Sequence, residues 1–315
     1  MTKLADGSWL AVHTIFPPDA PSQLEIARST DRARTWTVLS TVVDPGRKVD
    51  NGFLIQLPNG EVLLTGRSLI DGSSYRLPVW RSSDNGLSWQ DPGTRPRYVS
   101  VIDSSGGTGT PTWKGLWEPF FFLLPGGGVS VMYADETVTG HSQVIAQRIS
   151  VDGGVSWGAE TLVAAEPGAA RPGMPGVARM IDGRYIVSFE VCLTRGCDVY
   201  TKTSADGISW GPGLGTAVPR QNCGPFVTSL TDGRLVITSC SNEVSYSNDL
   251  GATWSRNEPP AWPVGQSFTW PAIYQTGPGE IGVVAGVTGG HRIRFGTVEP
   301  MRDAPVRKRA DLAEN

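Results

Sequence analysis

The sequence has little that would serve a metal ion, a phosphate group or a nucleic acid. Only 3 of the 315 residues are histidine, and their spacing does not match a zinc site. Charged residues make up 18% of the chain and the formal net charge is −3, so the basic surface typical of nucleic-acid-binding domains is missing. Neither a glycine-rich phosphate loop nor a Gly-x-Ser-x-Gly nucleophile motif occurs. We therefore expect no metal, no cofactor and no nucleic-acid partner.

Long apolar segments are absent as well. No stretch approaches the roughly 20 apolar residues that a membrane-spanning helix requires, so we expect no association with a membrane. The first residues, Met1 to Gly7, also lack the apolar core of a signal peptide. We nevertheless expect a secreted or extracellular monomer whose leader is missing from this chain, with a cytoplasmic protein as the alternative.

The four cysteines leave the compartment open. Cys192 and Cys197 bracket a short loop, and Cys223 and Cys240 fall on neighbouring predicted strands. Two disulfides would imply an oxidising compartment, whereas four buried free thiols would not. The sequence supports the two interpretations equally.

Glycine and proline are abundant, with 39 and 24 residues, and no long segment is free of both. This composition argues against helices and favours short strands joined by turns. A repeated motif spans most of the chain, so we expect one domain over residues 1–300, followed by a charged, disordered tail over residues 301–315.

That repeated motif combines a serine, an aspartate, a glycine and a tryptophan at near-constant spacing. The copies are Ser29–Trp36, Ser82–Trp89, Ser150–Trp157, Ser204–Trp210 and Ser247–Trp254. The Ser and Asp side chains are expected to bond backbone groups of a tight turn, and the glycine to adopt a positive φ. We expect the tryptophan to pack into the core of its own repeat. The first copy has Ala33 in place of glycine, and the fourth is one residue shorter.

The motif resembles the Asp-box of sialidase-like β-propellers. Six glycine-containing turns between apolar runs predict six hairpins, beginning at Ala5–Gly7, Pro58–Gly60, Pro125–Gly127, Asp182–Gly183, Asp232–Gly233 and Gly277–Gly279. We therefore predict an all-β, six-bladed propeller of four-stranded antiparallel blades, with no Asp-box in the last blade. The first hairpin begins so near Met1 that the first blade is expected to be truncated at its innermost strand.

The expected strand order separates the Asp-boxes from the functional face. In the third blade we predict strands over residues 118–124, 129–133, 143–149 and 161–163, the first lining the central channel. The first hairpin and the Asp-box of each blade then lie on one face. The starts of the first strands and the ends of the second strands lie on the opposite face, which we expect to form the funnel.

Two glutamates at this funnel are candidates for catalysis. Glu118 lies between Trp117 and Pro119 and runs into an apolar strand, and Glu190 ends another apolar strand in the next blade. Each could be an ordinary strand-end glutamate paired with arginine or water. Because an unpaired carboxylate among apolar residues is costly to bury, two of them on one face favour an acid/base and nucleophile pair. Substrate-binding candidates on the same face are Asp50, Asn51, Arg67, Trp117, Asp135, Arg171, Met174, Asn222 and Trp270.

Four segments indicate which family among the sialidase-like propellers this sequence resembles. Those over residues 50–60, 115–120, 171–178 and 185–190 look like glycoside hydrolase family 93, whose members are exo-acting α-1,5-L-arabinanases. The resemblance implies that Glu118 and Glu190 are the catalytic pair of a retaining enzyme that releases arabinobiose from linear arabinan. We expect Glu190 to be the nucleophile and Glu118 the general acid/base.

Two other functions compete with this interpretation. A sialidase of the same fold would need an arginine cluster for the sialic acid carboxylate, and no Phe/Tyr-Arg-Ile-Pro segment occurs near the N-terminus. A non-catalytic carbohydrate-binding propeller would have little use for two carboxylates within apolar sequence. Loss of hydrolysis in Glu118→Ala and Glu190→Ala distinguishes an enzyme from a binding module.

Overall fold

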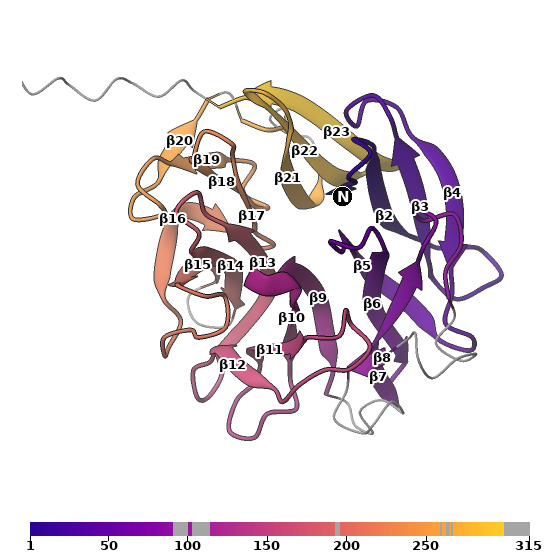
Figure 1. Ribbon diagram of the computed structural model, residues 1–315. Coiled ribbons are helices and arrows are strands. Elements are labelled where there is room, and N and C mark those ends of the chain that lie inside the picture. Colours follow the sequence, from indigo (N-terminus) through magenta and orange to yellow (C-terminus); the bar gives the residue numbers. More distant parts are fainter. Residues whose placement is uncertain are drawn as a thin grey trace, which may run out of the picture.

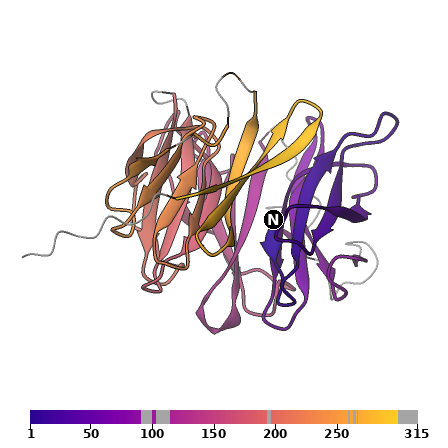
Figure 2. The ribbon, with the colours of Figure 1, turned by 90° about the horizontal axis from the view of Figure 1, so that it is seen from above.

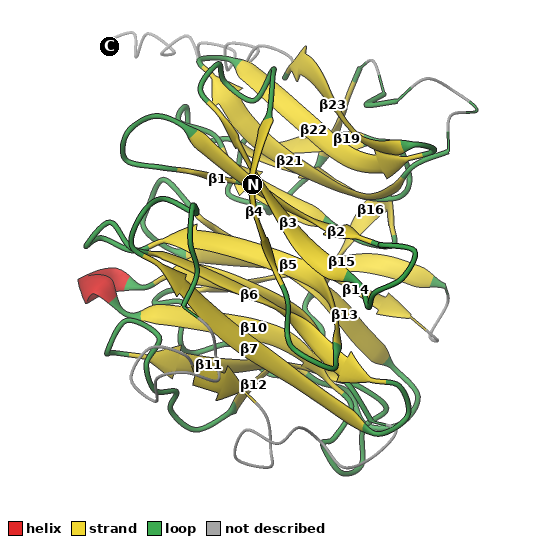
Figure 3. Cartoon of the chain, turned by 90° about the vertical axis from the view of Figure 1, so that its right-hand side faces the viewer, coloured by secondary structure: helices red, strands yellow, loops and turns green. Residues whose placement is uncertain are grey.

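A computed structural model describes residues 1–90, 100–102, 114–192, 196–258, 260–262, 265 and 267–298. Six antiparallel sheets surround a central axis, which is the predicted six-bladed propeller (Figure 1). Seen from above, the sheets stand side by side around that axis (Figure 2). The described chain is almost entirely strand and loop, with a single turn of 3-10 helix at Pro125–Gly127 (Figure 3). No described helix is long and apolar enough to span a bilayer. The predicted tail over residues 301–315 lies outside the described residues.

Each sheet is formed by strands that follow one another in the chain. Blades one to three, from the inner strand outwards, are β1 (Thr2–Lys3), β2 (Trp9–Ile15), β3 (Gln23–Ser29) and β4 (Thr37–Val42); β5 (Lys48–Gln56), β6 (Val62–Ile70), β7 (Ser74–Ser82) and β8 (Ser100–Ile102); and β9 (Leu116–Leu123), β10 (Val129–Asp135), β11 (Val144–Ser150) and β12 (Thr161–Ala164). Blades four to six are β13 (Arg171–Arg179), β14 (Tyr185–Cys192), β15 (Cys197–Ser204) and β16 (Thr216–Asn222); β17 (Phe226–Ser229), β18 (Leu235–Thr238), β19 (Val244–Ser247) and β20 (Ser255–Asn257); and β21 (Thr269–Gly277), β22 (Glu280–Val287) and β23 (Gly290–Thr297).

Where the ring closes, the shortened first blade is as predicted, and the sixth blade differs from the four strands that were predicted. The first blade has all four strands, although its inner strand β1 is only two residues long. The sheet with three strands among the described residues is the sixth. Blades six and one meet through specific side-chain contacts. Arg34 of blade one forms an ion pair with Glu280 and lies over the ring of Phe295, both in blade six.

The hydrophobic core lies between blades rather than inside them. Five clusters of buried side chains each combine the facing sides of two successive blades. The Asp-box tryptophans follow this arrangement and do not pack only into their own repeat, as the sequence had suggested. Trp89 donates a hydrogen bond to Ser40 of the preceding blade, and Trp210 donates one to Gln147 of its preceding blade. Since a single twisted sheet cannot bury its own faces, the bulky ring fills the gap beside its neighbour.

Within each Asp-box, the hydrogen bonds are those predicted. In the third copy, the Ser150 hydroxyl donates to Asp152 and accepts the Gly154 N–H, at 2.6 and 2.7 Å. Asp152 also accepts the N–H groups of Val155 and Ser156. These donors lower the pKa of Asp152 to about 2, although burial opposes the shift. Arg81 joins this box to the first hairpin of blade two, because it bonds both Gly153 and Glu61. The boxes and these hairpins therefore share one face.

We expect Asp152→Ala to weaken the fold without changing the chemistry. The loss of several bonds to one exposed carboxylate should lower the Tm at pH 7 by roughly 2–4 °C. Because the pKa is depressed in the folded state, this stabilisation should fade as the pH falls from about 4 to about 2. Thermal unfolding of both proteins at pH 7 and pH 2.5 measures this. An unchanged Tm at pH 7, or a large change in KM, would contradict the purely structural role.

The centre of the ring holds a cavity of about 550 Å³. Its walls are largely apolar and include Phe53, Phe120, Phe226 and Tyr274, and it extends to the hairpin turn at Pro125–Gly127. Neither candidate glutamate lines it. The cavity thus opens toward the hairpin and Asp-box face, and the glutamates lie at the opposite end of the inner strands.

Candidate active site

The funnel ends of the inner strands share an unusual backbone conformation. Five non-glycine residues there have a left-handed φ between 45° and 60°: Asn51, Glu118, Met174, Cys223 and Trp270. In β5, β9, β13 and β21 the strand pairing shifts register at this point. Three of the five residues precede a proline, which ordinarily favours an extended conformation. Such strain costs on the order of 1–3 kcal/mol per residue and clusters at functional sites, where bulges redirect side chains.

The two candidate glutamates approach each other around Gly173. Register pairs Gly173 with Glu190, and the next residue, Met174, donates its N–H to Glu118 Oε2 at 2.8 Å. A methyl group placed on Gly173 would lie 3.3 Å from Glu118 Oε2 and 3.6 Å from Glu190 Oε1. These two oxygens are therefore no more than about 7 Å apart, a bound that admits the roughly 5–5.5 Å separation of retaining glycosidases.

Burial raises the pKa of both carboxyl groups. The pKa of Glu118 rises from 4.5 to about 7, mainly through desolvation and further through the charge of Glu190. The Met174 N–H and the charges of Arg67 and Arg171 oppose this rise. Desolvation also raises the pKa of Glu190, against the hydrogen bonds of Gly224 and Cys223. A much larger fraction of Glu118 is therefore protonated near neutral pH than of an ordinary glutamate, as a proton donor requires.

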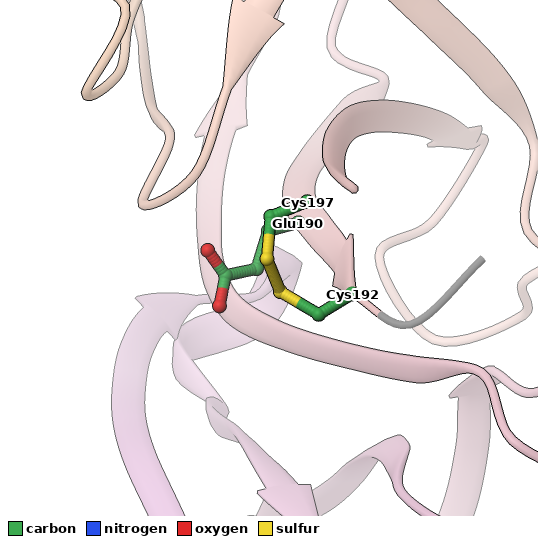
Figure 4. Close-up of side chains that lie close together, drawn as sticks. All are labelled: Glu190, Cys192 and Cys197. Atoms are coloured by element: carbon green, nitrogen blue, oxygen red, sulfur yellow. A yellow bond between two sulfur atoms is a disulfide. The ribbon is translucent and has the colours of Figure 1, made fainter. Parts of the chain in front are cut away.

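Glu190 is surrounded by the four cysteines of the chain. Gly224 donates its N–H to Glu190 Oε2 at 2.7 Å, and the nearby Cys223 side chain also favours the ionised form of this carboxyl group and so lowers its pKa. Cys192 and Cys197 form a disulfide beside it, with both sulfurs and a Glu190 oxygen within 4.8 Å of one another (Figure 4). The Cys223 and Cys240 sulfurs, not bonded as a disulfide, lie 2.6 Å apart. One disulfide and one closely spaced cysteine pair thus lie beside Glu190.

Arg67 and Trp117 form a wall on the blade-two side of Glu118. Arg67 makes a two-point ion pair with Asp50, with its Nε 2.7 Å from Oδ1. Its guanidinium also lies 4.4 Å from the centroid of the Trp117 ring, which contacts Tyr75. Asp50, Arg67 and Trp117 were all predicted for this face, and the structure brings them together.

Met174 and Trp270 lie on the opposite side, near Glu190. A methyl group placed on Gly224 would lie 3.0 Å from Trp270 Cδ1 and 3.7 Å from Met174 Cε. Both side chains therefore adjoin the residue that bonds Glu190. Trp270 is 62% exposed, although it is a large aromatic residue. An exposed ring beside a carboxylate pair offers a stacking surface for a sugar.

Three other residues predicted to bind the substrate lie in surroundings that differ from those of the residues above. Asp135 is only 3% exposed, accepts the Thr137 N–H and interacts with Glu160, so its carboxylate is directed into the protein. Asn222 was predicted at the start of an inner strand, but it ends β16, the outer strand of blade four, because Cys223 begins the crossing to blade five. Asn51 occupies a bulge and is partly exposed.

Arg171 holds a polar cluster beneath Glu118 that the sequence did not reveal in full. Its guanidinium bonds Glu136, Ser142 and Gln143. Gln143, only 7% exposed, in turn donates to the Pro172 carbonyl at 2.8 Å. The predicted funnel residues come from first and second strands, whereas Gln143 immediately precedes β11, a third strand. Third strands also begin at the funnel face. Including the residues at the starts of third strands among the candidates could therefore have identified Gln143 from the sequence.

Comparison with known proteins supports the architecture. No protein-family model and no curated protein matches the sequence. Among solved structures, an α-L-arabinofuranosidase of glycoside hydrolase family 93 from Fusarium graminearum, in complex with arabinobiose, matches with a TM-score of 0.78 at 21% identity, over 93% of this chain and 90% of that one.

An α-L-arabinanase from Penicillium chrysogenum, also with arabinobiose, matches with a TM-score of 0.74 at 21% identity, over 94% and 91% of the two chains. The Hadza microbial sialidase Hz136 matches with a TM-score of 0.66 at 13% identity, over 94% of this chain and 64% of that one. The chain thus has the sialidase-like six-bladed propeller fold, in a form similar along nearly its full length to the family 93 structures.

Proposed function

We propose that this protein is a retaining exo-glycoside hydrolase that acts on α-1,5-linked L-arabinan or its oligosaccharides. The observation that carries the proposal is the pair of partly buried carboxylates, Glu118 and Glu190, on either side of Gly173. The fold similarity to arabinobiose-bound structures supports an arabinan-type substrate. The Cys192–Cys197 disulfide fits action in an oxidising, extracellular compartment.

The carboxylate oxygens that accept no backbone N–H suggest which glutamate is the nucleophile and which is the proton donor. Glu190 Oε2 accepts the Gly224 N–H, which leaves Oε1, on the side of Glu118, to attack the anomeric carbon. Glu118 Oε2 accepts the Met174 N–H, so Oε1 would carry the proton to the departing glycosidic oxygen. The resulting glycosyl ester on Glu190 is then hydrolysed by water, whose proton returns to Glu118.

The walls of the site suit a neutral sugar. Trp270 offers a ring for stacking, and Trp117 with Arg67 offers a second surface with hydrogen-bond donors. We propose further polar contacts from Asp50, Asn51 and Asn222, and packing from Met174. Arg171 and the buried Asp135 would act by supporting the site from beneath. Arg67 and Arg171 each already face a carboxylate, which disfavours a sialidase, because sialic acid would need free arginines.

The deciding experiment is hydrolysis of linear α-1,5-arabinan by the purified full-length chain. We expect arabinobiose as the first product, with retained anomeric configuration in ¹H NMR of the early reaction. A parallel panel of sialosides and aryl glycosides tests the alternatives. Cleavage of a sialoside alone would replace the proposal with a sialidase, and binding without cleavage of any glycan would replace it with a carbohydrate-binding protein.

The pH profile depends on the shifted pKa of Glu118. The proton donor is competent only below its pKa, so kcat/KM should fall as the pH rises above about 7. The nucleophile must be ionised, so kcat/KM should also fall on the acid side, at a pH above the usual 4.5 of a glutamate, because the pKa of Glu190 is raised. Initial rates on arabinan from pH 4 to pH 9 measure both limbs. A flat profile from pH 6 to pH 9 would exclude Glu118 as the donor.

A further inference from the structure

We propose that Gln143 is a positioning residue that holds the backbone between the two glutamates and thereby sets the protonation of Glu118. The inference rests on the proposed function for its kinetic test but on geometry alone for its argument. Gln143 lies outside the strands that carry the glutamates, directly before β11.

The orientation of the Gln143 amide is determined by its partners. Arg171 Nη2 donates to Gln143 Oε1 at 2.6 Å, and Gln143 Nε2 donates to the Pro172 carbonyl at 2.8 Å. A guanidinium can only donate and a carbonyl can only accept, so only this orientation satisfies both. Because the side chain is 7% exposed, losing either bond would leave a buried polar group unpaired.

The Pro172 carbonyl matters because the next two residues both adjoin the glutamates. Gly173 is the register partner of Glu190, and Met174 donates its N–H to Glu118 Oε2. Met174 has a left-handed φ of 55°, a conformation that relaxes unless its surroundings hold it. Gln143 bonds this segment one residue before Gly173. It thus anchors the strained backbone whose N–H stabilises the ionised form of Glu118.

Arg171 ties the same anchor to the rest of blade three. Its guanidinium also bonds Glu136, whose second oxygen accepts the Gly115 N–H at 2.7 Å. Gly115 lies one residue before β9, the strand that carries Glu118. The start of β9 and the bulge of β13 are therefore joined by one chain of contacts through Glu136, Arg171 and Gln143. A change at Gln143 removes the bond to Pro172 but leaves the Gly115–Glu136–Arg171 contacts and both glutamate side chains in place.

The test uses two variants at Gln143 and one matched control. Gln143→Leu and the unbranched Gln143→Met both remove the two bonds without adding a charge near Glu118. Gln147→Leu is the control, because Gln147, in β11, is also buried, with an exposed fraction of 0% against 7% for Gln143, and bonds Ser130, Gly207 and Trp210, on the Asp-box side. If Gln143 only stabilises the fold, all three variants should have a lower Tm, and the pKa of Glu118 should be unchanged in each of them.

We expect both Gln143 variants to move the basic limb of kcat/KM upward by roughly one pH unit, because a weakened Met174 N–H bond stabilises the Glu118 carboxylate less. Misplacement of the pair should also lower kcat by roughly tenfold or more. Gln147→Leu should leave the limb in place. An unmoved limb in both folded Gln143 variants, or an equal shift in Gln147→Leu, would overturn the proposal.

A second readout needs no substrate. The ¹³C carboxyl resonance of Glu118, assigned by its loss in Glu118→Gln, can be titrated in the wild type and in each variant. We expect its midpoint to rise in Gln143→Leu and Gln143→Met only. If the wild type hydrolyses no glycan, the proposed function fails while this titration still decides the role of Gln143. If the wild type is active and the midpoint does not move, the role of Gln143 alone is rejected.

Discussion

Glu118→Ala is expected to lower kcat/KM on linear arabinan by roughly 10²–10⁴-fold, the usual contribution of a general acid/base. Glu190→Ala should lose at least as much, because no covalent intermediate can form without its carboxylate. Both variants should fold, since each removes a partly buried group whose desolvation opposes its charge. Initial rates and circular dichroism of the two variants test this expectation.

Azide separates the two roles. With an activated aryl arabinoside, azide should restore turnover in Glu190→Ala and give a glycosyl azide of inverted configuration, because it replaces the nucleophile. In Glu118→Ala it should intercept the glycosyl ester and give a product of retained configuration. The reverse pattern would exchange the two assignments and leave the enzyme class intact. Glu280→Ala, at the ion pair with Arg34 in the ring closure, is the matched control and should keep full activity.

Gly173→Ala should also inactivate the protein, although it removes no functional group. The added methyl would lie 2.9 Å from Gln143 Nε2, closer than such atoms normally approach, and within 3.6 Å of both carboxylates. At least one of these groups must move. A displacement of about 1 Å at the reacting groups costs on the order of 100-fold in rate, and we expect a loss of kcat of this size.

The same strand supplies the control for that substitution. Gly176, three residues further along β13, has no atom closer than 3.4 Å to an added methyl. Gly176→Ala should therefore change kcat by less than about threefold, in line with a tolerated contact. Equal kinetics in the two alanine variants would mean that the space between the glutamates is not constrained as the structure indicates. The Tm of each variant shows whether overpacking has instead unfolded the blade.

Much of the fold could be predicted because its signals are local. The Asp-box bonds join residues at most four positions apart, as in Ser150 and Gly154, so the motif is complete within one short segment. Hairpin turns can likewise be recognised from the sequence by glycines such as Gly60, which has a φ of 89°. Counting these units gave six blades and the face on which Glu118 and Glu190 lie. The packing of Trp89 against the preceding blade was not predictable in this way, because its partner Ser40 is 49 residues away.

The sequence by itself thus determined the repeat, the strand order and the two carboxylates at the funnel, since each depends on short-range turn chemistry and on alternation along a strand. The tertiary structure alone decided how those carboxylates are held. Glu118 receives its backbone donor from Met174 in the next blade, and Glu190 receives its donor from Gly224 beyond β16. Gln143, which precedes β11, bonds the β13 segment beside Met174 through the Pro172 carbonyl. Only the packing of successive blades brings such distant segments within hydrogen-bonding distance. The same packing buries Glu118, and this desolvation raises its pKa although the Met174 N–H opposes the rise.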